Sequence, residues 1–262
     1  MKRVCGRRLC ALAPLLVIVV ASALGAAAAN EPAGRLDPAR AWCGPSRARP
    51  LGCGEAGVDL LALVSAAELR AVALAVAVAL VGFVVGTSVG AGAALVRGRF
   101  ERGVDRTCDL VQAFPSFILA LAVLSAVRSP SRVALGAVFA LTAWAPFARL
   151  ALAQTRVLRD AAFVEAAVAL GRGSFGVLAR HILPNLLGIV AVQLGSTGAA
   201  VVVSEAALAF VGFGPPGGVS LGGVLDQGVA AMLRTPYVLA VGAAAVFATS
   251  ASMLLAGQAA ER

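Results

Sequence analysis

Residues 71–96 read AVALAVAVALVGFVVGTSVGAGAALV, a run of 26 residues without a charged side chain. At 1.5 Å per residue, a helix of this length exceeds the roughly 30 Å hydrocarbon core of a bilayer, so the run predicts a transmembrane helix. A helix is required because an isolated strand would leave its backbone polar groups unsatisfied in lipid. Within the run, Gly82, Gly86 and Gly90 recur every fourth residue, which predicts a flat face where another helix packs closely.

The composition of the whole chain is that of a membrane protein. Of its 262 residues, 60% are hydrophobic and only 13% are charged, which is about half of the charged share of a soluble domain. These values exclude a disordered chain, a coiled coil and nearly every soluble enzyme. We therefore predict an all-α polytopic membrane protein with about six transmembrane helices.

Five further apolar stretches are candidates for transmembrane helices. They cover residues 9–29, 110–127, 133–148, 186–213 (with Glu205 inside) and 237–257. Basic residues favour the cytoplasmic side of a membrane. If the N-terminus is cytoplasmic, the inside segments hold 14 of the 22 Lys and Arg residues and the outside segments hold the other 8. We therefore expect both termini in the cytoplasm.

The chain divides into three predicted parts: an N-terminal transmembrane helix over residues 1–30, an extracytoplasmic segment over 31–68, and a core transmembrane domain of about five helices over 69–262. Two alternatives stay open in the first two parts. The first helix also has the features of a cleavable secretory signal. Cys43 and Cys53 lie in a segment expected in an oxidising compartment, where they either form a disulfide or remain two thiols.

Candidate catalytic residues are few. His181, the single histidine, lies at a predicted membrane boundary without the partners that a metal site or a Ser/His pair needs. Asp105 and Asp109 share one helix edge, whereas an intramembrane aspartyl protease needs aspartates on facing helices. The only lysine is Lys2, so there is no P-loop, and the scattered arginines argue against nucleic-acid binding. We expect no catalytic residue, no cofactor and no metal site.

Asp109 and Glu205 are ionisable residues next to or inside apolar stretches, where an unpaired charge is costly. Asp109 begins the third stretch and is either a pathway residue or a charge at headgroup level near Arg106. Glu205 interrupts the fifth stretch and must face protein or water. Both are candidates for lining a pathway or for packing between helices.

The segment over residues 149–185 is the most informative loop. Asp160–Leu170 reads as a short helix that Asp160 caps and Gly171 ends. Ser174 would then cap a second short helix that stops before Pro184. The first helix is apolar although it should lie in water, which favours a partner groove that buries it over a helix lying on the membrane surface.

This loop resembles the EAA motif in the permease subunits of ATP-binding-cassette importers, and its flanks resemble the dipeptide, oligopeptide and nickel class. The residues that carry the resemblance are Phe163, Val164, Glu165, Ala166, Ala167, Gly171, Ile182, Leu183, Pro184 and Asn185. Further matches occur in order over about residues 50–262, including the segments that begin at Asp109 and Glu205. Departures from the family pattern occur at Cys53, Gly54 and Val58.

The resemblance implies the transmembrane subunit of an ATP-driven importer for peptides or a similar small solute, in the inner membrane of a prokaryote. It implies a second permease subunit, two cytoplasmic ATP-binding subunits that hydrolyse the ATP, and an extracytoplasmic substrate-binding protein. The helix ending at Gly171 would dock in a groove of an ATP-binding subunit. The alternative is a secondary transporter driven by an ion gradient, which would favour inverted repeats and more buried carboxylates.

Overall fold

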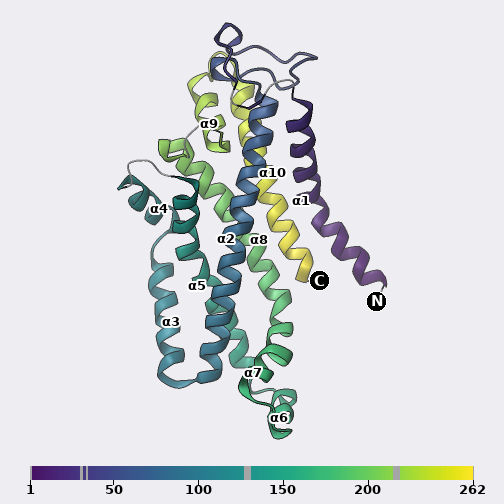
Figure 1. Cartoon of the computed structure of the whole chain (residues 1–262), viewed down its shortest axis with the longest axis vertical. Helices are drawn as coiled ribbons and strands as arrows, with labels where there is room; N and C mark the ends of the chain where they lie inside the picture. Colours follow the sequence, from purple (N-terminus) through teal and green to yellow (C-terminus); the bar gives the residue numbers. More distant parts are fainter. Residues whose placement is uncertain (1, 30–31, 34, 127–130, 215–218, 262) are drawn as a thin grey trace.

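A computed structural model describes residues 2–29, 32–33, 35–126, 131–214 and 219–261 of the chain (Figure 1). Within these residues the chain forms helices and no strand. The α-helices are α1 (Lys2–Ala28), α2 (Leu60–Val96), α3 (Gly98–Ala113), α4 (Ser116–Ser125), α5 (Arg132–Leu158), α6 (Ala162–Ala169), α7 (Ser174–Val177), α8 (Leu183–Leu208), α9 (Leu221–Ala230) and α10 (Pro236–Glu261). Two π-helical segments, Leu178–Ile182 and Ala209–Phe213, flank α8.

Four helical stretches are long and apolar enough to cross a membrane. They are Leu60–Val96, Arg132–Leu158, Ser174–Phe213 and Pro236–Gln258. The pair α3 and α4 makes a fifth if it is taken as one span with a 71° bend, and the apolar part of α1, Ala13–Ala28, is a shorter helix. The predicted all-α polytopic membrane protein is confirmed, with four or five such spans in the described residues.

The helix α2 begins before the charge-free run of residues 71–96. Its N-cap is Asp59, whose Oδ1 accepts a hydrogen bond from the backbone N–H of Leu61 at 2.9 Å. Glu68 lies inside this helix and accepts hydrogen bonds from Ser22 of α1 at 2.5 Å and from Thr249 of α10 at 3.4 Å. The absence of charged residues therefore indicates a segment suited to a membrane, but it does not indicate where the helix begins.

The glycine face of α2 packs against α5. A Cβ atom at Gly86 would overlap the carbonyl oxygen of Trp144, and one at Gly90 would overlap that of Ala148. The two backbones are thus close enough that no side chain fits between them, as the four-residue glycine spacing predicts.

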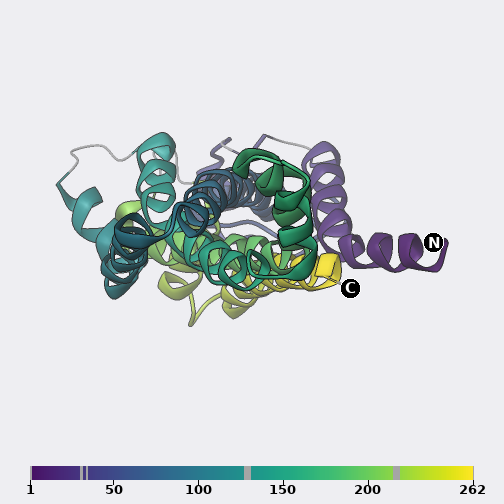
Figure 2. The same ribbon diagram turned by 90° about the horizontal axis from the view of Figure 1, so that it is seen from below.

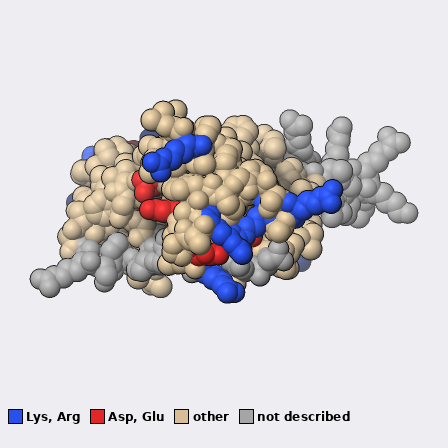
Figure 3. Space-filling model, turned by 90° about the horizontal axis from the view of Figure 1, so that it is seen from above, with Lys and Arg blue, Asp and Glu red and all other residues tan. Residues whose placement is uncertain are grey.

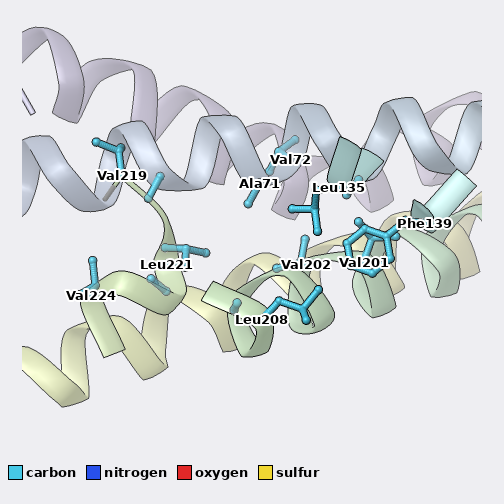
Figure 4. Packing of buried hydrophobic residues seen from close by; sticks show 14 of the residues in the cluster. Ala71, Val72, Leu135, Phe139, Val201, Val202, Leu208, Val219, Leu221 and Val224 are labelled. Carbon is cyan, nitrogen blue, oxygen red and sulfur yellow. The ribbon is translucent and has the colours of Figure 1, made fainter. Parts of the chain in front are cut away.

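The main core lies where α2, α5, α8 and α9 meet. Figure 4 shows its aliphatic and aromatic side chains pointing toward one another between these helices. The labelled members are Ala71, Val72, Leu135, Phe139, Val201, Val202, Leu208, Val219, Leu221 and Val224.

The two ends of the bundle differ. One, the disulfide end, carries α9 and the segment before α2, in which Cys43 and Cys53 form a disulfide. Tyr237 donates a hydrogen bond to the carbonyl of Cys43 at 2.8 Å and fastens that segment to α10. Acidic and basic side chains occur together at this end on a mostly uncharged surface (Figure 3). The other, the α6 end, carries α6, α7 and the connection from α2 to α3 (Figure 2).

Candidate functional site

The short helix α6 projects from the bundle just after α5 ends (Figure 1). Its N-cap is Ala161 and no side chain caps it, so the predicted cap by Asp160 is wrong. The Asp160 carboxylate instead accepts a hydrogen bond from Arg97, at the end of α2, at 2.8 Å. This ion pair links the start of the α6 loop to the α2–α3 connection.

Gly171 ends α6, as its position predicts. Its φ is +81°, a conformation that glycine adopts at little cost. The N–H of Gly171 donates to the carbonyl of Val168 at 2.9 Å, and the N–H of Arg172 donates to the carbonyl of Ala167 at 3.1 Å. These two bonds form a Schellman motif. A Cβ on Gly171 would meet no atom within 4 Å, so the space beside it is open.

The predicted second helix, capped by Ser174 and stopped before Pro184, is wrong on both counts. Gly173 is the N-cap of α7, and no side chain caps it. The chain then continues through the π-helical segment into α8, and Pro184 lies in the first turn of α8. Proline is compatible with a first turn, where its missing N–H is not required, and the preceding π turn resets the hydrogen-bond register.

Two faces of α6 have different surroundings. Val164 and Ala167 are buried in a second apolar cluster with Val177, Ile182 and Leu186, which seats α6 and α7 against α8. The rest of α6 is exposed. We use the name α6 face for its large exposed apolar side chains together with that of Phe175 at the start of α7; the members are Phe163, Val168, Leu170 (89% exposed) and Phe175 (82% exposed). Several large apolar side chains exposed on one short segment point to an interaction site.

The other residues of the predicted motif differ in burial. Glu165 and Ala166 are exposed on α6, and Pro184 is exposed at the start of α8, whereas Leu183 is partly buried against the second cluster. The ring of His181 lies beside that of Phe163, with 6.4 Å between centroids. Phe175 was missed from the sequence because it lies outside the motif and follows the glycine break.

A network of charged side chains fixes the end of α5, from which α6 continues. Arg156 donates hydrogen bonds to Glu101 at 2.6 Å and to Asp105 at 3.0 Å, both on α3. Arg159 donates to Glu101 at 3.3 Å and to the carbonyl of Ala94 at 2.5 Å. This network was not predicted, because its partners are more than 50 residues apart and share no local spacing.

The structure gives Asp109 and Glu205 different environments. Asp109 accepts a hydrogen bond from Arg149 at 2.6 Å, and not from Arg106. Both side chains of that pair are more than half exposed. Glu205 is 6% exposed within the chain itself, and its Oε2 has no hydrogen-bond partner among the described residues.

A cavity of about 360 Å³ opens between α3, α4, α5 and α8. None of the described residues that line it is charged, but several carry hydroxyl or amide groups that can hydrogen-bond a polar solute. These polar lining residues are Gln112, Ser116, Thr142, Gln193, Ser196, Thr197 and Ser204. They come from different helices, so no sequence motif marks them. Among the described residues no group of His, Cys, Asp and Glu could hold a metal ion.

Known proteins resemble most of the chain. Residues 82–260 match the family described as binding-protein-dependent transport system inner membrane component. The glutathione transport system permease protein GsiD of Pectobacterium atrosepticum is 30% identical over 217 residues, which cover 82% of this chain and 71% of that protein. GsiD of Shigella dysenteriae serotype 1 is 31% identical over the same shares of the two chains. The family match includes α6, the second cluster and the cavity.

Proposed function

The chain belongs to the family of binding-protein-dependent transport system inner membrane components, and from this premise we propose how it couples solute import to ATP hydrolysis. It is a multi-pass permease of the bacterial inner membrane in an ATP-driven importer of the peptide class. The observation that carries the proposal is the α6 face, an exposed apolar surface on a short helix that the rest of the chain holds in a fixed position.

The α6 face docks into a groove of a cytoplasmic ATP-binding subunit. Burying its side chains there would contribute a few kcal/mol, at about 25 cal/mol per Å² of apolar area. Val164 and Ala167 anchor α6 to α8 through the second cluster, and the network around Glu101 holds α5 to α3. A movement of the ATP-binding subunit would therefore reach several transmembrane helices together, as a rigid-body displacement.

The remaining partners follow from the same family. A second permease subunit would face this one across the pathway, a second ATP-binding subunit would serve it, and a substrate-binding protein would deliver the solute at the disulfide end. ATP hydrolysis takes place on the ATP-binding subunits, and this chain is not itself an enzyme. The family match supports this arrangement over a secondary transporter driven by an ion gradient.

The cavity between α3, α4, α5 and α8 is the part of the surface best suited to face the solute. Its amide and hydroxyl groups could hydrogen-bond a peptide-like solute. The described lining carries no charged side chain that would bind the solute too tightly for release. The relatives are named as glutathione transport permeases, which supports a solute of peptide character.

Cysteine crosslinking tests the docking of α6. Ala166 is exposed on α6 and its neighbour Ala167 is buried in the second cluster, so the two positions form a matched pair. We expect Ala166→Cys to crosslink to an ATP-binding subunit in the assembled complex, and Ala167→Cys to crosslink much less. If Ala166→Cys in an assembled, transporting complex never crosslinks, the docking proposal is wrong.

A reporter fusion tests the orientation that this function requires. We propose that the α6 end and both termini are cytoplasmic and that the disulfide end is outside, where the Cys43–Cys53 bond is chemically stable. A reporter that is active only outside the cytoplasm should be active near residue 45 and silent at residue 262. Activity at residue 262 would contradict the proposed orientation.

A further inference from the structure

The helix α3 carries three arginines on one face at the α6 end of the bundle. Arg99, Arg102 and Arg106 are spaced by three and four residues, so they lie above one another along the helix, and all three are exposed. Gly103 lies between them, and a Cβ there would meet no atom within 4 Å. Together these four residues line a hollow of about 330 Å³ on the surface.

The opposite face of α3 is acidic and is already paired. Glu101 and Asp105 lie on that face and accept hydrogen bonds from Arg156 and Arg159 of the α5 end. No ion pair within the described part of the chain involves the three arginines of the outer face. Their positive charge is therefore available to a partner outside the chain.

The outer face of α3 changes from basic to apolar along the helix. One turn beyond Arg106 the same face presents Leu110, which is 66% exposed. From Arg99 to Leu110 the helix rises by about 17 Å, at 1.5 Å per residue. The order of charge followed by hydrocarbon matches a phospholipid, whose anionic headgroup is followed by its acyl chains.

We propose that Arg99, Arg102 and Arg106 bind the phosphate-bearing headgroup of an anionic phospholipid, with the acyl chains beginning against Leu110. Three guanidinium groups can surround a phosphate with several charge-assisted hydrogen bonds. A lipid accounts for the apolar continuation of the stripe, which a water-soluble acidic partner would leave uncovered. The helix α3 lies at the edge of the bundle (Figures 1 and 2), and its three arginines are exposed.

Lipid titration of the purified full-length chain in detergent, followed by native mass spectrometry, tests the proposal. The site variant is Arg102→Gln/Arg106→Gln. The matched control is Arg172→Gln/Arg180→Gln, which removes two exposed arginines from the same end of the chain. With phosphatidylglycerol we expect the site variant to weaken the tightest binding by about fivefold for each arginine, roughly 25-fold in total. The control should change that affinity by less than about twofold, because removing charges elsewhere on the surface acts only through screened, long-range electrostatics.

Three further measurements distinguish a specific lipid site from general charge effects and from a site for a free anion. Phosphatidylcholine should bind the unmodified chain and the site variant equally, because its headgroup has no net charge. The variant Arg102→Lys/Arg106→Lys keeps the charge and should retain most of the phosphatidylglycerol binding, which shows that the glutamine variant lost charge and not fold. Inorganic phosphate at constant ionic strength should not displace the lipid.

Four results would overturn the proposal. Unchanged phosphatidylglycerol affinity in the site variant, or an equal loss in the control, would show that these arginines form no lipid site. Displacement of the lipid by inorganic phosphate would indicate a site for a free anion. Crosslinking of Arg102→Cys to another subunit in the assembled complex would show that a protein covers this face.

Discussion

Replacing Gly171 with glutamate is expected to lower solute uptake and substrate-stimulated ATP hydrolysis by about tenfold or more, while the protein stays in the membrane. A tenfold change corresponds to about 1.4 kcal/mol of lost docking energy. Gly171 has φ +81°, which costs a residue with a side chain about 1–2 kcal/mol. The glutamate would also project into open space beside the α6 face, where it would place a charge in an apolar interface.

A matched control is available at Gly98. It lies at the same end of the bundle, has φ +71°, and a Cβ there would also meet no atom within 4 Å. Gly98→Glu thus introduces the same charge and a similar backbone strain outside α6. We expect it to leave uptake within about twofold of the unmodified protein, which corresponds to less than about 0.5 kcal/mol. The affinity of the binding protein for its solute should be the same in both variants. Normal uptake by Gly171→Glu would show that the loop is only a connector.

The features that sequence could predict depend on local physics. A segment that crosses lipid must be apolar and must satisfy its own backbone hydrogen bonds, so hydropathy alone predicts the all-helical membrane fold. The glycine spacing in α2 predicts the close approach of α5, because a missing side chain acts at its own position. Gly171 predicts the end of α6 for the same reason, since positive φ is a property of a single residue.

The features that sequence could not predict depend on distant partners. Aspartate is a common helix N-cap, but the Asp160 carboxylate forms an ion pair with Arg97 instead. Pro184 has the character of a helix breaker, but a π turn places it where a proline fits. The network around Glu101 arises only when α3 and α5 are brought together, and the exposed position of Phe175 depends on how α6 and α7 pack in the second cluster.

The second large effect concerns that network. We expect Glu101→Ala to lower the free energy of unfolding by about 2–3 kcal/mol, because it leaves two arginines without their shared carboxylate. The Glu101 side chain is only 10% exposed and that of Arg159 is 17% exposed, so water replaces the lost interaction poorly. The expected loss is below that of a fully buried pair, because Arg156 is more exposed and keeps its bond to Asp105. Thermal unfolding in detergent should show a midpoint about 5 °C lower or more.

Asp109→Ala is the matched control, since Asp109 lies on the same helix and also pairs with an arginine of α5. That pair is more than half exposed on both sides, so its removal should cost less than about 1 kcal/mol. If the network positions α6, Glu101→Ala should also reduce ATP-driven uptake at temperatures where the protein remains folded. Equal midpoints for the two variants would contradict a stabilising role for the network. A destabilised Glu101→Ala protein with full uptake would show that α6 keeps its position through the second cluster alone.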